Sequence, residues 1–305
     1  MYMKLEFIEE PGVRKERLSD WCKTQNISFY EYNGILYTNR QQLVQPLAPF
    51  YKSINLTKRE ALNIINVLKG GVIRWPARKN KKINTKKDWY IVVKSIGAHY
   101  DELSTSTKGL LDKGFNNFTV KKVDALQIAK KGFNILQKHN AQHLNFDDII
   151  PYHSEEQFID IITKDQKFDD IIHYFGIFLK DELIGFCRCN VYDKTEVHLT
   201  QLIIDNEHLT YGAKHALTWY ILGYYFDYCQ YKTIVSGSRP YDPTDKNSQF
   251  FLEEFMFEKA YFDLNVVFRR DIDYKVSFMK PFKKIMGKIN ADLQVFIDID
   301  EQKTK

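Results

Sequence analysis

The stretch Thr195-Glu-Val-His-Leu-Thr-Gln-Leu-Ile-Ile-Asp205, followed by Tyr211-Gly-Ala-Lys-His-Ala-Leu-Thr-Trp-Tyr-Ile-Leu222, decides the fold of this chain. The first part is rich in strand-forming residues and predicts a long strand. The second is apolar around its whole circumference and predicts a helix that is buried on most sides. Upstream, residues 174–180 and 184–191 are two further β-rich runs joined by a connection of hairpin length. We therefore expect three antiparallel strands followed by a core helix.

A second group of elements follows the helix. The run Thr233-Ile-Val-Ser236 is short and β-branched, and a polar break separates it from a short helix that begins near Asn247. A further strand is expected from Ala260 to Arg269. The predicted order of this half is therefore β-β-β-α-β-α-β.

This order resembles the acyltransferase fold of the GNAT superfamily. The segment Phe251-Leu-Glu-Glu-Phe-Met-Phe-Glu-Lys-Ala260 resembles the closing helix and strand of that family, and residues 101–123 resemble the joint between the halves of FemAB-like transferases. Such transferases carry two GNAT-like lobes. The resemblance implies an α/β (α+β) fold in which a mixed, mostly antiparallel sheet is flanked by helices. We expect a partial GNAT-like lobe in residues 1–115, a GNAT-like acyltransferase domain in 116–290 and a C-terminal tail in 291–305.

Composition limits the class of protein. The chain has 305 residues, of which 44% are hydrophobic and 15% aromatic, and this favours two well-filled globular domains. Its apolar runs are shorter than the roughly 20 residues that a membrane-spanning helix needs, and acidic residues occupy the N-terminus where a signal peptide is apolar. We expect a cytoplasmic protein without a membrane span. The net charge of +5 permits an anionic ligand but does not favour DNA binding.

Two sequence features admit two interpretations each. Cys187 and Cys189 share one face of a predicted strand, and they are either buried free thiols, which we expect, or half of a metal site. No complete metal-binding motif is present, so we predict no metal. The connector that contains Arg78-Lys-Asn-Lys-Lys-Ile-Asn-Thr-Lys-Lys87 holds six cations and no acid. It is either a solvated loop or an arm that meets a phosphate-bearing ligand or an anionic surface.

The first lobe contains the clearest local signals. A helix is expected from Val13 to Thr24, and Asn33-Gly34 predicts a hairpin between two strands. Thr57-Lys-Arg-Glu60 has the pattern of a capping box and predicts the start of a second helix.

The family resemblance implies where a donor would bind. Leu202, Ile203 and Ile204 match the splayed strand segment that pairs with the pantetheine arm of acyl-CoA in the family. The loop that holds the pyrophosphate matches residues 209–214, with Tyr211, Gly212, Ala213 and Lys214 as the contacts. The family pattern places Gln or Arg first and Gly or Ala last, whereas this chain has Leu209 and Lys214, so acyl-CoA use is in doubt. Transfer RNA as a donor is possible but not favoured, because the joint retains few cations.

Two further departures concern the closing helix. Many GNAT enzymes carry a tyrosine there as the general acid, and the matching residue is Leu252. The glycine of the family's "Gly-Phe" pair is replaced by Met256. Any acid catalysis must therefore come from another part of the chain.

The central strand carries the candidate base. By strict alternation, Glu196, His198 and Thr200 share one face and Val197, Leu199 and Gln201 share the other. We expect His198 to be the general base, because histidine changes protonation near neutral pH, with Glu196 orienting it or acting through water. The alternative is that both residues decorate a solvent-facing sheet. Ser236, Ser238 and Arg239 either bind the acceptor or only end a strand.

The predicted function is transfer of an acyl or aminoacyl group from an acyl-CoA or aminoacyl donor to the amine of a small or cell-surface-precursor acceptor. The alternative is a non-catalytic GNAT-like binding or scaffold protein. The sequence contains no P-loop, zinc spacing, dinucleotide fingerprint or G-x-S-x-G elbow.

Overall fold

The computed structural model describes residues 15–40, 42–47, 54–77, 89–95, 97, 99–141, 152, 154–193, 196–240, 246–282, 296–297 and 300. Contacts divide the chain into two compact units that each draw on separate segments of the sequence. Unit 1 comprises residues 1–21, 92–237 and 245–258, and unit 2 comprises residues 22–91, 238–244 and 259–305. The predicted boundary between two lobes at residue 115 stays a prediction. The basic connector from Arg78 to Lys87 lies outside the described residues.

Unit 1 is built on a mixed, mostly antiparallel sheet with the strand order β6-β7-β8-β9-β10. The strands β6 (Thr119–Val123), β7 (Ile172–Leu179), β8 (Glu182–Asp193) and β9 (Glu196–Ile204) pair antiparallel. The strand β10 (Thr233–Pro240) pairs parallel with β9. The three-stranded meander predicted from the sequence is thus β7, β8 and β9. The strands β5 (Trp89–Lys94) and β10 each have residues in both units.

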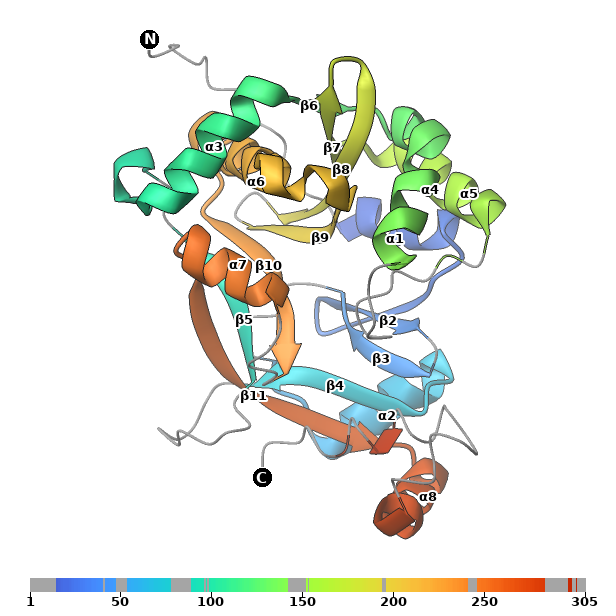
Figure 1. The fold of residues 1–305 in the computed structure, drawn as a ribbon. Helices are drawn as coiled ribbons and strands as arrows, with labels where there is room; N and C mark the ends of the chain where they lie inside the picture. Colours follow the sequence, from blue (N-terminus) through green and yellow to red (C-terminus); the bar gives the residue numbers. More distant parts are fainter. Residues whose placement is uncertain are drawn as a thin grey trace. The chain divides into compact units, whose positions relative to one another are not determined.

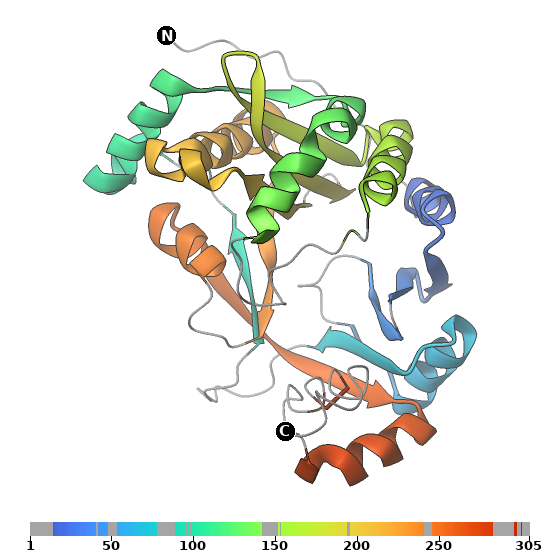
Figure 2. The ribbon, with the colours of Figure 1, turned by 45° about the vertical axis from the view of Figure 1, so that its right-hand side comes forward.

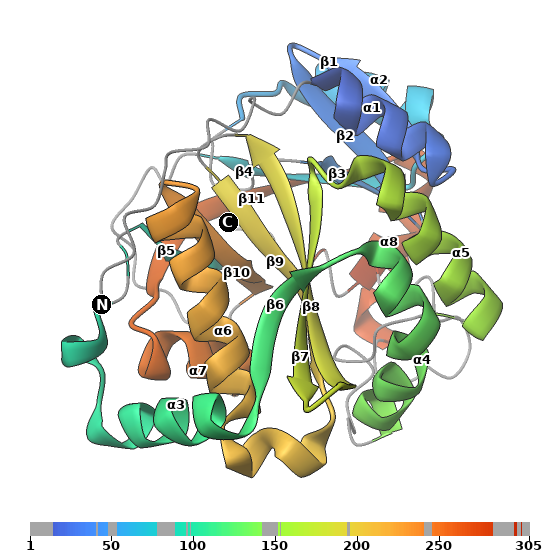
Figure 3. The same ribbon diagram turned by 90° about the horizontal axis from the view of Figure 1, so that it is seen from above.

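Helices cover both faces of this sheet, as Figure 3 shows. One side carries α3 (Thr105–Asn117) and α6 (Ala213–Gly223), and the other carries α4 (Ala125–Ala141) and α5 (Glu155–Asp165). The helix α7 (Lys246–Glu254) and most of α1 (Lys15–Thr24) also belong to unit 1. The core helix predicted for residues 211–222 begins after Gly212 and continues beyond Gly223 as a π-helical turn, Tyr224–Tyr228.

Within unit 2 the strand order is β1-β2-β3-β4-β11, with mixed pairing. Its strands are β1 (Ser28–Tyr32), β2 (Ile35–Arg40), β3 (Leu43–Pro46), β4 (Val72–Ala77) and β11 (Glu258–Phe268), of which β3 and β4 pair parallel. Asn33 and Gly34 form the predicted turn between β1 and β2 with positive φ angles of 49° and 74°. All residues of β11 except Glu258 lie in this unit.

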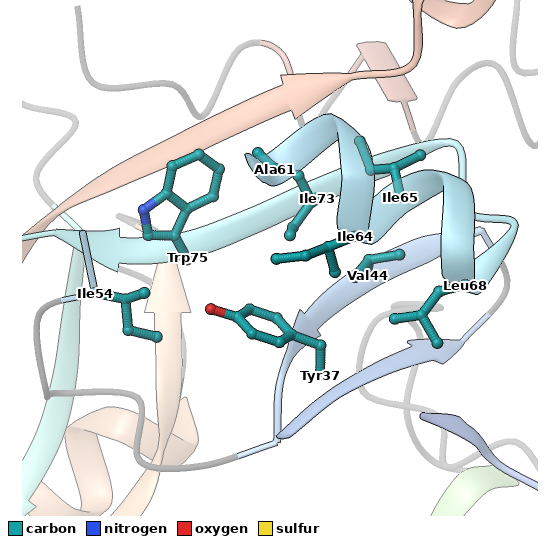
Figure 4. Close-up of a cluster of buried hydrophobic side chains, with 9 residues drawn as sticks. All are labelled: Tyr37, Val44, Ile54, Ala61, Ile64, Ile65, Leu68, Ile73 and Trp75. Carbon is teal, nitrogen blue, oxygen red and sulfur yellow. The ribbon is translucent and has the colours of Figure 1, made fainter. Parts of the chain in front are cut away.

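The helix α2 (Lys58–Leu68) supplies the apolar centre of unit 2, which Figure 4 shows. The capping box predicted from the sequence is present, because Thr57 accepts from the Glu60 backbone and Glu60 accepts from the Thr57 backbone. The buried face of the helix packs with side chains from β2, β3 and β4. The cluster consists of Tyr37, Val44, Ile54, Ala61, Ile64, Ile65, Leu68, Ile73 and Trp75.

A smaller apolar cluster fixes the last helix, α8 (Arg270–Met279), in unit 2 (Figure 1). Val276 is its buried residue, and it packs with Val72, Phe268, Phe296 and Ile297. Residues 296 and 297, which the sequence places in a tail, therefore contribute apolar side chains to a core cluster.

Candidate functional site

The parallel pairing between β9 and β10 opens part of the way along β9. Glu196, Val197 and His198 face Thr233, Ile234 and Val235 of β10, and no pairing beyond His198 is present among the described residues. On its other side β9 stays paired with β8 as far as Ile204. Leu202, Ile203 and Ile204 therefore lie beyond His198, the last residue of β9 that pairs with β10. The family resemblance places a splayed segment at this point.

A β-bulge in β9 accompanies this opening. Gln201 faces Arg188 and Leu199 faces Cys189, so Thr200 is the extra residue without a cross-strand partner. Its hydroxyl instead donates to the Arg188 carbonyl at 3.0 Å. The extra residue reverses the alternation that the sequence analysis assumed. Gln201, and not Thr200, continues the face that carries Glu196 and His198, which corrects that prediction.

Glu196 and His198 form a buried pair in the part of β9 that is paired with β10. His198 Nε2 contacts Glu196 Oε1, and the two residues are 5% and 0% exposed. This burial excludes the interpretation that they decorate a solvent-facing sheet. The second carboxylate oxygen, Glu196 Oε2, is buried and has no hydrogen-bond partner among the described residues. An unsatisfied buried carboxylate oxygen is costly, so this oxygen is able to accept a hydrogen bond from a bound group or a water molecule.

The same sheet face continues into a buried polar network that the sequence analysis did not identify. Arg188 Nε donates to Asp165 Oδ2 at 3.0 Å, and Asp165 also accepts from Tyr174 and from the Trp21 indole, both at 2.8 Å. Next to this network, the Gln201 amide donates to the Tyr152 hydroxyl at 3.0 Å. The signal in the sequence was one arginine, Arg188, among the otherwise apolar residues 183–189. The network fixes α1 and α5 against β7 and β8.

The turn that follows β9 is packed against α3. Gly212 has a φ of +78°, and a Cβ atom at this position would lie 2.0 Å from the Leu110 carbonyl oxygen. Gly114 of α3 approaches the same turn, because its Cβ would lie 2.6 Å from the Gly212 oxygen. Lys113 donates to the Thr210 carbonyl at 2.9 Å. Gly212, the one residue retained from the family's phosphate-loop pattern, thus has a packing role here.

The other residues of the expected phosphate loop have partners within unit 1. The ring of Tyr211 is exposed and lies 4.7 Å from the Lys113 ammonium. Ala213 is buried, and the Lys214 ammonium lies 4.0 Å from the centre of the Phe250 ring on α7.

The acceptor residues expected at the end of β10 are only partly described. The Ser236 hydroxyl lies 3.5 Å from the Val92 carbonyl of β5. Ser238 and Arg239 belong to β10, but their side chains lie outside the described part of the chain.

Lys94 on β5 and Met256, which follows α7, are in contact within unit 1. Lys94 is buried, and burial lowers the pKa of its ammonium, which lies 3.5 Å from the Met256 carbonyl. Met256 itself has a positive φ of 53°, a conformation that favours glycine. Met256 therefore has a backbone conformation that glycine would adopt with less strain.

The two cysteines of β8 are free and buried, and their sulfurs lie 3.7 Å apart. Burial raises the pKa of the Cys187 thiol. Within the described ranges, no group of three or more His, Cys, Asp or Glu side chains is placed to hold a metal ion. The same ranges contain no helix with the length and apolar character needed to cross a bilayer.

Comparison with known proteins gives a fold but no family. No protein-family model matches the sequence, and no curated protein matches it either. Two solved structures share the fold over most of both chains. The crystal structure of FemX has a TM-score of 0.55 at 10% identity and covers 88% of this chain and 95% of its own. The C-terminal domain of a protein assigned as a lysylphosphatidylglycerol synthetase from Agrobacterium fabrum has a TM-score of 0.50 at 9% identity, with coverages of 89% and 96%.

These likenesses confirm the FemAB-like resemblance and the α/β fold class predicted from the sequence. At such low identity they establish the fold alone.

Proposed function

We propose that this chain is an acyltransferase that moves an acyl or aminoacyl group to the amine of an acceptor. The observation that carries the proposal is the buried Glu196–His198 pair in the part of β9 that is paired with β10, directly before the Thr200 bulge. Past the ladder, β9 has backbone groups on the β10 side that an extended donor can pair with. Acyl transfer to an amine needs a positioned donor and a base that removes a proton. In this proposal the open edge of β9 positions the donor, and the buried pair is the base.

In this proposal His198 and Glu196 accept the proton of the attacking amine. The amine nitrogen forms a bond to the donor carbonyl carbon, the bond from that carbon to the thiol sulfur or ester oxygen breaks, and the amine proton goes to the histidine–carboxylate pair. Glu196 orients the imidazole through its contact with Nε2. Leu202, Ile203 and Ile204 would position the donor, and Ser236 with Ser238 and Arg239 would contact the acceptor.

A second candidate, a non-catalytic binding or scaffold protein, is favoured by the packing of the turn after β9. The turn at Gly212 is in close contact with the α3 backbone, and Lys214 is directed to Phe250. An acyl-CoA diphosphate that used these amides would have to share the turn with α3. The same packing makes a donor without a diphosphate, such as an aminoacyl group on transfer RNA, compatible with the transferase proposal.

Calorimetry with a panel of donors separates these possibilities. Acetyl-CoA, longer acyl-CoAs and an aminoacyl-tRNA would be titrated into the wild-type protein, and the aminoacyl-tRNA would be compared with the same tRNA without its amino acid. Saturable heat with one donor class, together with transfer to a primary amine, supports the enzyme. No heat with any of these donors, in a protein shown to be folded, overturns the acyltransferase proposal in favour of the binding protein.

A further inference from the structure

The helix α8 presents apolar side chains on two sides. Val276 faces the core, with Ile272 and Met279 packed against the same cluster. Tyr274 and Phe278 are 67% and 74% exposed, the highest values among the large hydrophobic residues that the structure describes. They lie four positions apart and so form neighbours on one helix face. Neither ring belongs to the apolar cluster around Val276, as far as the structure describes the chain. Figure 2 shows α8 as the red-orange helix at the lower edge of the view.

The aromatic pair is accompanied by positive charge. Arg270 and Lys275 are exposed along the helix, whereas Lys280 at its end pairs with Asp300 at 2.6 Å. Of the two acidic side chains of α8, Asp271 is bound by Arg269, with Nε and Oδ1 2.7 Å apart, and Asp273 is exposed. In the sequence, residues 275–288 contain five lysines and no acidic residue. The α8 face therefore combines two exposed aromatic rings with the exposed cations Arg270 and Lys275.

We propose that this face, made by Tyr274, Lys275, Phe278 and Arg270, binds the surface of an anionic lipid bilayer. Aromatic rings insert at the boundary of headgroups and acyl chains, and nearby lysines and arginines attract anionic headgroups. The proposal is independent of the transferase function, because α8 belongs to unit 2 and shares no residue with the Glu196–His198 site.

The small area of the exposed aromatic face favours a lipid surface over a protein partner. Two aromatic side chains supply roughly 300–500 Å² of surface that can be buried. A standard protein interface needs about 800 Å² from each partner, with matched shape. A bilayer requires no shape complementarity, so a short helix with two exposed rings and neighbouring cations is sufficient for reversible binding.

Vesicle co-sedimentation of the full chain tests the proposal. Wild-type protein should sediment with vesicles of phosphatidylcholine plus phosphatidylglycerol, much less with phosphatidylcholine alone, and less as salt rises. Tyr274→Ser with Phe278→Ser should weaken binding at least about tenfold. Lys275→Glu should weaken it several-fold. Val67→Ser, which changes a half-exposed apolar residue on α2, should bind as the wild type does.

The controls separate lipid binding from other causes. All substituted residues are exposed, and circular dichroism with thermal unfolding should show unchanged folding in each variant. The proposal is overturned if wild-type protein binds neither kind of vesicle, or if the double variant binds as well as the wild type. Concentration-dependent self-association that the double variant abolishes, in the absence of vesicle binding, would instead assign the face to a second copy of the chain.

Discussion

Asp165 on α5 and Arg188 on β8 form a buried ion pair, with Arg188 Nε donating to Asp165 Oδ2 at 3.0 Å. The side chain of Asp165 has no exposed surface, and it also accepts from Trp21 and Tyr174. One carboxylate of α5 thus binds side chains of three other elements, α1, β7 and β8. The pair matters less for net attraction than for what its loss would leave behind, namely a buried, uncompensated guanidinium.

Asp165→Ala should therefore lower the free energy of unfolding by about 3–5 kcal/mol. Urea denaturation measures the change. Asp160→Ala on the same helix is the control, because Asp160 is exposed and pairs with Lys164 one turn away, and it should cost about 0.5 kcal/mol. Equal losses in the two variants would show that the buried network has no special role.

Gly212→Ala should destabilise the chain, because the new methyl group would lie 2.0 Å from the Leu110 oxygen and the residue has a φ of +78°. Strain and overpacking together predict a loss of about 2–4 kcal/mol. Gly109→Ala in α3 is the matched control. A Cβ there meets nothing within 4 Å, so alanine should stabilise the helix by about 0.5–1 kcal/mol. Thermal unfolding that moves both variants in the same direction would contradict the packing found at the turn.

The sequence predicted most elements because their signals are local. The capping box at Thr57, the Asn33-Gly34 turn and the β-branched run of β9 each act over a few residues. The bulge at Thr200 was missed, since a period-two pattern does not register an extra residue. Its consequence is that Gln201 changes faces.

The candidate site was predictable only in part, because local signals identify only contacts between residues that are close in the sequence. The proximity of Glu196 and His198 follows from their spacing on one strand. In contrast, the Asp165–Arg188 pair joins residues 23 positions apart, and the contact of Gly212 with α3 joins segments about one hundred positions apart. Such contacts depend on how helices cover the sheet, which the sequence pattern does not specify.

Tyr37→Phe should leave stability unchanged or raise it by up to about 1 kcal/mol. The Tyr37 hydroxyl is buried in the apolar cluster of Figure 4 and has no hydrogen-bond partner in the described part of the chain. Tyr32→Phe is the contrasting variant, because it removes a hydroxyl that donates to Glu60 at 2.7 Å, and it should cost about 0.5–1.5 kcal/mol. A larger loss in Tyr37→Phe than in Tyr32→Phe would refute this account.

His173 should make the chain sensitive to mild acid. Burial lowers the pKa of its imidazole to about 3, with a further contribution from Lys122 that Asp170 opposes. The unfolded chain binds this proton near its ordinary pKa of about 6.5, so stability is complete above that value and falls as the pH drops toward 3. By about pH 5 the loss should be roughly 2 kcal/mol.

His173→Gln tests this link by removing the titrating group. The variant should lose less stability than the wild type between about pH 7 and pH 5, by the same roughly 2 kcal/mol. Urea unfolding at the two pH values gives the comparison, and other ionisable groups largely cancel because both proteins share them. Parallel pH profiles would locate the acid sensitivity elsewhere.

His198→Ala should lower the turnover of the proposed acyl transfer by about 10²- to 10⁴-fold, because it removes the base next to the open edge of β9. Glu196→Gln should cause a smaller loss, since the amide still contacts the imidazole but no longer stabilises its charge. Donor affinity should stay nearly constant in both variants, because Leu202, Ile203 and Ile204 are untouched. Steady-state kinetics and calorimetry on the same preparations measure the two effects, and His99→Ala, at an exposed histidine, is the control. Full turnover in His198→Ala would exclude it as the base and direct the search to Ser236.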